Sequence, residues 1–170
     1  MKKNSVVKIM VLGTGLCLLA MPVLGFKEED LEKLRRTNEC IRCDLSGADL
    51  RSAKLSRANL RSSNLSGANL RGASLNEVNL SLANLSEAEL VGSNLRRSNL
   101  HKANLSASDL SAADLSAADF REVDLTGANL NYADLENANL AGADMREARM
   151  LDARFCNTKM PNQEMNHSGC

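Results

Sequence analysis

Bulky apolar residues recur at every fifth position from Leu45 to Met160, without a change of phase. Leucine fills 19 of these 24 central positions, and methionine or phenylalanine fills the others. The residue two places before each centre is small, and it is alanine in 16 repeats. The residue just before the centre is Asp or Asn in 18 repeats, and the two residues after it are mostly polar or small. The chain therefore repeats a five-residue unit with a fixed order of apolar and polar positions.

Neither a straight helix nor a straight strand accommodates this period. Five residues rotate an α-helix by about 500°, so the central residues would spread over every face of the helix. In a strand, an odd period sends alternate central residues to opposite faces. The pattern is satisfied if the chain changes direction once per repeat, with the Asp/Asn and Ser/Gly positions at the corners. We therefore predict a solenoid whose turns stack through backbone hydrogen bonds at about 4.8 Å.

The motif, seen in GADLRS, RANLRS, SAADLSAADF and TGANLNYADLENANL, closely resembles the pentapeptide-repeat family over about residues 44–160. The resemblance implies an all-β fold, a right-handed quadrilateral β-helix with four pentapeptides per turn and about six turns. The central residue and the small residue two places before it would then face inward. One implied core ladder, with one residue per turn, consists of Leu45, Leu65, Leu85, Leu105, Leu125 and Met145.

Residues 1–25 are predicted to be a signal peptide. The basic stretch MKKNSVVK precedes a short apolar run, and the small residues Val23 and Gly25 precede an expected cleavage before Phe26. The run is short for a membrane span and is followed by Pro22. We therefore expect a periplasmic or secreted protein with no stable membrane span after cleavage. An uncleaved membrane anchor is the alternative.

Both ends of the repeat array need a cap, because a solenoid otherwise exposes its core there. Residues 26–43 are predicted to form an N-terminal cap with a short helix over 28–37, in which acidic residues come early and basic residues late. Leu31 and Leu34 are expected to cover the first turn. At the other end Pro161 stops the pattern, so the repeat domain is assigned to 44–160. Residues 161–170 are expected to form a partly ordered tail.

Four cysteines follow the predicted signal, and an even number suggests two disulfides in an oxidising compartment. Cys40 and Cys43 precede the first repeat, and Cys156 and Cys170 lie near the other end. A Cys-x-x-Cys pair also suits redox chemistry or half of a zinc site, but this pair runs directly into the first repeat. We favour a local disulfide or cap pair there. For Cys156, His167 and Cys170, a metal site is the weaker alternative to a disulfide.

The sequence points to no enzyme, cofactor or metal site. It lacks a Gly-x-Ser-x-Gly elbow and contains only two histidines, which leaves little from which to build a catalytic triad. His101 follows a central leucine, so we expect it to lie on an outer face in contact with solvent. A formal charge of zero gives no overall preference for nucleic acid.

Charge is unevenly distributed along the repeats. Residues 42–102 hold nine basic and five acidic groups, whereas residues 103–144 hold eight acidic groups and one basic group. The plain interpretation of this gradient is a solvated surface, and a partner-binding surface or a calcium site are the alternatives. The candidate residues are Arg51, Arg71, Asp109, Asp114, Asp119 and Asp124.

The expected function is that of a non-enzymatic, exported bacterial scaffold or protein-binding solenoid. Its partner would be a protein of unknown identity and not a nucleic acid, and a homo-oligomer is left open. The resemblance also offers an alternative, because some pentapeptide-repeat proteins mimic DNA and protect gyrase from quinolones. Those proteins depend on acidic faces, dimerisation and often on loops that break the repeat. This sequence instead has mixed charge, an unbroken repeat and an export signal.

Overall fold

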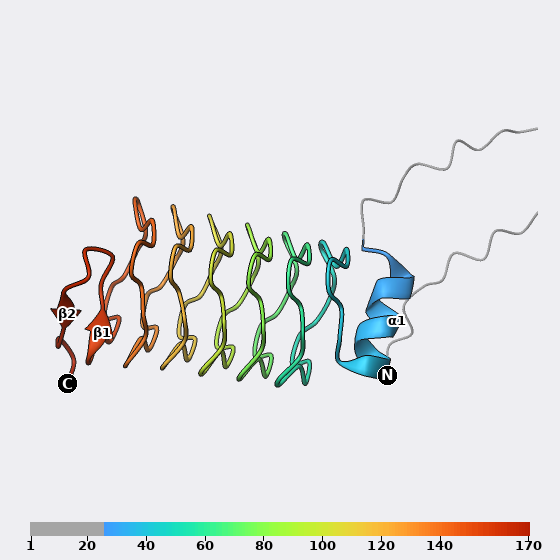
Figure 1. The fold of residues 1–170 in the computed structure, drawn as a ribbon, viewed down its shortest axis with the longest axis horizontal. Helices are drawn as coiled ribbons and strands as arrows, with labels where there is room; N and C mark the ends of the chain where they lie inside the picture. The colour runs from blue at the N-terminus through green and yellow to red at the C-terminus, as the bar shows by residue number, and fades with distance from the viewer. Residues whose placement is uncertain (1–25) are drawn as a thin grey trace, which may run out of the picture.

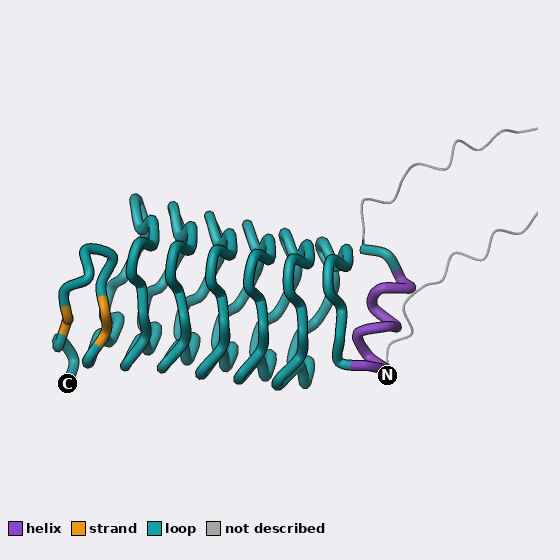
Figure 2. The backbone as a smooth tube through the Cα atoms, in the orientation of Figure 1, coloured by secondary structure: helices purple, strands orange, loops and turns teal. Residues whose placement is uncertain are grey.

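The computed structural model describes residues 26–170, so the predicted signal peptide in residues 1–25 lies outside the described residues. The chain forms a rod-shaped coil, with helix α1 (Glu28–Thr37) at one end and a hairpin at the other (Figure 1). The hairpin consists of β1 (Thr158–Lys159) and β2 (Met165–Asn166). Between the two ends, stacked turns without named helices or strands build the body of the rod (Figure 2).

Each turn of the coil contains 20 residues, which is four pentapeptides. Parallel bridges join a residue to the one 20 positions later, and they run without interruption from Glu39–Asn59 to Asn139–Lys159. The column that begins at Glu39 reaches Lys159 in six such steps. The four-repeat turn implied by the resemblance is therefore present, and it starts one repeat earlier than expected, because Glu39 already pairs with the next turn.

Backbone hydrogen bonds hold neighbouring turns together. In one representative repeat the Leu65 N–H donates to the Asn84 carbonyl at 2.7 Å, and the Gly67 N–H donates to the Ser86 carbonyl at 2.8 Å. Since most repeats make equivalent bonds, the coil satisfies its buried backbone groups as a β-sheet does, although each side of a turn is too short to count as a strand.

The corners explain the polar positions of the repeat. Asn64 Oδ1 accepts the N–H of Ser66, two residues later, at 3.2 Å, and the Ala68 N–H closes the turn on the Leu65 carbonyl at 3.0 Å. Gly67, at the second corner position, has a φ of 61°, in the left-handed region. Asp and Asn recur before the centre because their side chains can accept this N–H bond.

The core is a continuous stack of leucines and alanines along the axis of the rod. In the predicted ladder, Leu45, Leu65, Leu85, Leu105 and Leu125 are each 0% exposed. Met145 is only partly buried, because no complete turn follows it. Where serine occupies the small inward position, its hydroxyl finds a backbone acceptor in most cases, as when Ser63 Oγ donates to the Leu60 carbonyl at 2.5 Å.

The helix expected over residues 28–37 is confirmed as α1. Its buried face presents Leu31 and Leu34 to the first turn. Acidic residues fill its first turn and basic residues its last, and Asn38 ends it in the left-handed conformation with φ 57°. The Asp44 N–H donates to Asp30 Oδ2 at 2.8 Å, which ties the helix to the first complete repeat. This 10-residue helix is the single helix among residues 26–170, and it is neither long enough nor apolar enough to cross a membrane.

Residues 161–170, expected as a partly ordered tail, fold back onto the last turn. β1 and β2 pair antiparallel, with Thr158 opposite Asn166 and Lys159 opposite Met165. The Phe155 N–H donates to the Ser168 carbonyl at 3.0 Å. The C-terminal segment therefore provides the last turn with some of the backbone partners that a further repeat would have supplied.

Candidate binding surface

Every turn presents four corners, and at most corners the two residues that follow a central residue are at least partly exposed. Corners stack in columns along the rod, because equivalent residues are 20 positions apart. The Ile41 column contains the pairs Ile41–Arg42, Arg61–Ser62, Ser81–Leu82, His101–Lys102 and Arg121–Glu122. The Ser56 column contains Ser56–Arg57, Asn76–Glu77, Arg96–Arg97, Ser116–Ala117 and Glu136–Asn137.

The four aspartates proposed as partner contacts lie on four different sides of the coil. Asp109, Asp114, Asp119 and Asp124 occupy successive repeats, and four repeats make one turn. Each carboxylate accepts the backbone N–H two residues later, at distances of 2.9 to 3.1 Å. They serve the corners of the fold and do not form one surface.

Arg51 and Arg71 are stacked one turn apart in another column. Arg51 donates to both carboxylate oxygens of Asp49, at 2.8 and 2.7 Å, and Arg71 lies 3.5 Å from Glu89. The hydrogen bonds from the Arg51 side chain lower the pKa of Asp49 to about 2. A backbone β-bridge joins Asp109 to Glu89 on this same side, so acidic residues lie beyond the two arginines along the rod.

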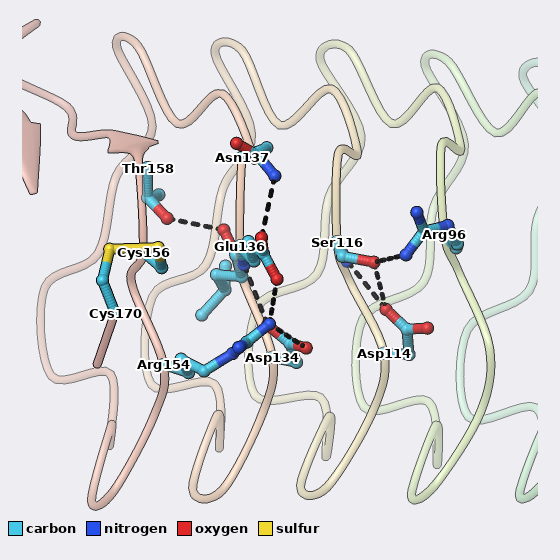
Figure 3. Close-up of polar contacts among 11 residues, drawn as sticks. Arg96, Asp114, Ser116, Asp134, Glu136, Asn137, Arg154, Cys156, Thr158 and Cys170 are labelled. Atoms are coloured by element: carbon cyan, nitrogen blue, oxygen red, sulfur yellow. Dashed lines mark hydrogen bonds and ion pairs between the residues drawn. A yellow bond between two sulfur atoms is a disulfide. The ribbon is translucent and has the colours of Figure 1, made fainter. Parts of the chain in front are cut away.

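Polar side chains of the Ser56 column bind one another between turns (Figure 3). Arg96 donates to Ser116 Oγ at 2.9 Å, and that hydroxyl donates to Asp114 at 2.5 Å. Arg154, one turn after Asp134 and next to this column, pairs with Asp134 at 3.0 Å and also with Glu136. The bonds to Asp134 raise the pKa of Arg154. On this side of the rod the charge of Arg154 is therefore neutralised within the molecule, whereas Arg96 bonds a neutral hydroxyl.

The Ile41 column differs from the Ser56 column, because two large aliphatic side chains are exposed on it. Ile41 is 44% exposed and Leu82 is 47% exposed. Two shallow depressions meet at Arg61 and Leu82; one extends toward Ile41 and the other toward His101. The charge gradient along the sequence did not point to Ile41, Arg61 or Leu82. The available signal was Leu82, an aliphatic residue at a corner position that elsewhere is mostly polar or small.

His101 lies on this outer column, as expected. Its Nδ1 atom is 3.1 Å from the Arg121 carbonyl oxygen, and its Nε2 atom is 4.0 Å from Glu122. Lys102 Nζ lies 3.4 Å from the same carboxylate. Glu122 thus neutralises the C-terminal part of the column and leaves the segment from Ile41 to Leu82 basic.

The cysteines form the two pairs named in the sequence analysis. The Sγ atoms of Cys40 and Cys43 are 2.09 Å apart, and those of Cys156 and Cys170 are 2.12 Å apart, both at disulfide distance. The second pair joins the C-terminal segment to the last turn (Figure 3). His167 does not join it, because its Nδ1 atom lies 2.9 Å from Asn157 Oδ1.

One group of potential metal ligands occurs in residues 26–170, formed by Asp30, Cys40 and Cys43. The two sulfur atoms are bonded to each other, and Asp30 Oδ2 accepts the Asp44 N–H. Thiolates are the form in which cysteine binds zinc, so the oxidised pair offers no metal site. The group is better described as the junction between α1 and the first turn.

Comparison with known proteins places this geometry in a family. The family profile described as pentapeptide repeats matches residues 43–81, 63–102, 79–116, 98–134 and 124–160, which together span most of the chain. The chain belongs to the pentapeptide-repeat family. No curated protein shows significant sequence similarity to it.

A solved structure from Arabidopsis thaliana has the same fold. A pentapeptide repeat protein from the Arabidopsis thaliana thylakoid lumen is 32% identical with a TM-score of 0.55, over 56% of this chain and 66% of that chain. HetL from the cyanobacterium Nostoc sp. strain PCC 7120, involved in heterocyst differentiation regulation, is 28% identical with a TM-score of 0.42, over 75% of this chain and 76% of its own. The plasmid-mediated fluoroquinolone resistance protein QnrB1 is 19% identical with a TM-score of 0.35, over 72% and 67%. The last likeness is too distant to bear on gyrase protection.

Proposed function

We propose that this pentapeptide-repeat protein is an exported, non-catalytic scaffold that binds a partner protein along the side of its coil. The observation that carries the proposal is the contrast between inward and outward positions. Inward positions repeat leucine and alanine almost without variation, whereas outward corners carry residues as different as Arg71, Glu77 and Leu82. Regular stacking of varied side chains is how solenoids present extended binding surfaces.

Three observations support export to the periplasm or the exterior. Residues 1–25 have the composition of a signal peptide. Two cysteine pairs at disulfide distance suit an oxidising compartment. The similar Arabidopsis protein comes from the thylakoid lumen. Our proposal therefore assigns the partner to an oxidising compartment outside the cytosol.

Site-specific photo-crosslinking tests the proposal. A benzophenone amino acid is introduced singly at one exposed corner residue of each column, namely Glu87, Ala112, Glu77 and Leu82. The buried Leu85 provides a matched inward control. Cells that export the protein are irradiated, and adducts are identified by mass spectrometry. We expect one protein to be captured repeatedly from one or two columns and not from position 85.

The opposite outcome is equally clear. Absence of adducts from all four columns, or retention of the uncleaved chain in the cytosol, overturns the proposal. An adduct of twice the mass of the chain identifies a second copy as the partner. The gyrase-protecting alternative instead predicts that cytosolic expression lowers quinolone sensitivity, whereas we expect no change.

A further inference from the structure

We propose that the Ile41 column is the binding surface of this scaffold, and that its partner presents an extended acidic segment with an aliphatic anchor. This inference rests on the proposed function and adds to it a surface and a partner chemistry. The surface, called here the Leu82 surface, consists of Ile41, Arg42, Arg61, Leu82, His101 and Lys102.

Leu82 is unfavourable for the folded chain alone. It has a φ of 61°, in the left-handed region that branched residues seldom adopt, and it is 47% exposed. Among the non-glycine residues with positive φ in the described chain, Leu82 and Tyr132 alone have large apolar side chains. A strained residue that also exposes an aliphatic group is an expected property of a binding site.

Ile41 completes the apolar part of the surface. It lies in the same column, two turns before the corner that contains Leu82, and it is 44% exposed. Two turns correspond to about 10 Å along the rod, which is about three residues of an extended chain. One segment lying parallel to the axis can therefore contact both aliphatic side chains.

The polar groups around Leu82 are mainly donors. Arg42 and Arg61, which line the depression on one side, have no acidic partner within 4.0 Å among residues 26–170. Asn79 and Asn99 line the other side, and each uses its Oδ1 atom to accept a backbone N–H. Their amide NH₂ groups meet no acceptor in the described chain, so they remain available to a ligand.

This combination selects the occupant. Guanidinium and amide donors favour carboxylates and peptide carbonyls, which an acidic segment supplies in abundance. The aliphatic side chains favour one hydrophobic anchor between the acids. A second copy lying on the same column is less suitable, because Glu122 is already neutralised by Lys102. A membrane surface is also less suitable, because Asn79 and Asn99 place polar groups beside the narrow apolar strip.

A defined peptide tests the inference directly. The exported protein is titrated into a fluorescent peptide of alternating glutamate and leucine, and binding is followed by anisotropy. The control peptide has glutamine in place of glutamate. We expect the acidic peptide to bind at least ten-fold more tightly, and this preference to decrease as salt is raised.

Matched variants locate the binding. Leu82→Ala and Arg61→Gln should each weaken binding of the acidic peptide about ten-fold or more. Tyr132→Ala should not, although Tyr132 has a φ of 62° and is 58% exposed in a different column. Thermal unfolding of each variant verifies that the coil is intact.

Each other outcome overturns the inference. Equal binding of the two peptides would show that the partner segment need not be acidic. If Tyr132→Ala weakens peptide binding and Leu82→Ala does not, the binding surface lies on another column. If the protein binds phosphatidylglycerol vesicles through Leu82 and does not bind the peptide, the partner is a lipid surface and not a protein. These results leave the photo-crosslinking test unaffected, so failure of this surface is distinguishable from failure of the scaffold function.

Discussion

At the N-terminal end of the rod, α1 lies across the first turn and leaves Leu50 and Leu55 only 5% exposed. At the C-terminal end, the central residue Met150 is 36% exposed. The N–H groups of Met145 and Met150 also lack a protein acceptor among the described residues, whereas Phe155 and Met160 donate to the C-terminal segment. The helix covers the core broadly, while the hairpin covers only part of the last turn.

The difference teaches how each end is stabilised. A helix with two buried leucines stabilises its end by removing apolar surface from water. A hairpin of two-residue strands buries little, so its attachment relies on a few backbone bonds and on the Cys156–Cys170 pair. We therefore expect the N-terminal end to depend on packing and the C-terminal end to depend on its covalent link.

The largest effect should come from removing packing beneath α1. Leu34→Ala truncates a side chain that is 2% exposed, and we expect a loss of about 2–5 kcal/mol in the free energy of unfolding. Met150→Ala, the matched change at the other end, should cost less than about 1 kcal/mol, because its side chain is 36% exposed. Urea unfolding followed by circular dichroism measures both. Equal losses would show that the two ends are covered alike.

Reduction of the disulfides should affect the C-terminal end first, which is the reverse of the order expected for the packing variants. Cys170 is exposed, whereas Cys40 and Cys43 are 0% and 4% exposed. Reduction requires a thiolate to reach the sulfur atoms, so a mild dithiol should open Cys156–Cys170 first. Alkylation and mass spectrometry would then label Cys156 and Cys170 while the N-terminal pair stays unlabelled. Simultaneous labelling of all four cysteines contradicts the proposed difference.

The double variant Cys156→Ala with Cys170→Ala measures the contribution of the C-terminal link. A closed loop of this size is worth about 3 kcal/mol in the chain-entropy model. We expect the loss to be local, so hydrogen exchange should accelerate at the amides of Phe155 and Met160. Protection at Leu85, in the middle of the rod, should remain and provides the internal control. Unchanged exchange at both end amides would show that the hairpin holds without its disulfide.

The same contrast separates what the sequence could predict from what it could not. The positions of Leu65 and Leu85 followed from the five-residue period, and α1 followed from its charge order and from Leu31 and Leu34. The hairpin was missed because β1 lies inside the last repeat and β2 follows Pro161, where the period ends. Strands of two residues are also too short to produce a recognisable pattern. Local periodicity fixes structures that repeat and gives little information on a segment that occurs once.

The candidate surface was less predictable than the fold. The partners of surface arginines depend on rotamers, so Arg57 bonds Glu77 on the next turn while Arg51 bonds Asp49 in its own repeat. The four aspartates suggested a charged surface, yet their carboxylates are used within the corners. Leu82 was detectable as an exception to the corner pattern, but its exposure and its basic neighbours required the coil to be built.

The middle of the rod is covered by turns on both sides, so it provides the reference for both ends. Substitutions of buried serines there should change the free energy of unfolding less than the larger changes at the ends. Ser98 Oγ is buried without a partner in the described chain, whereas Ser93 Oγ donates to the Leu90 carbonyl at 2.7 Å. Ser93→Ala should cost about 1 kcal/mol, and Ser98→Ala should be neutral or stabilising by a similar amount. Urea unfolding of the pair decides this, and equal losses would show that Ser98 is satisfied in solution.

The smallest expected effect is the loss of stability in acid. It is tested on two similar Asp–Arg pairs, one near each end of the rod. Hydrogen bonds from Arg51 lower the pKa of Asp49 to about 2, and those from Arg146 lower the pKa of Asp144. The folded pKa of Asp49 lies below its unfolded value of 3.8, so its stabilisation is present above pH 3.8 and is lost as the pH falls toward about 2. Because both side chains of the Asp49 pair are more than half exposed, solvent screens the interaction and its contribution to stability is small.

Carboxyl-carbon NMR titration of Asp49 measures this effect without relying on a stability change. Arg51→Ala should return its midpoint toward 3.8, and Arg146→Ala should leave it unchanged while raising the midpoint of Asp144. If the end with the better packing also held its ion pair more firmly, high salt would shift Asp144 more than Asp49. Equal shifts in salt would restrict the difference between the two ends to the core and the backbone, since both ion pairs would then behave as ordinary surface pairs.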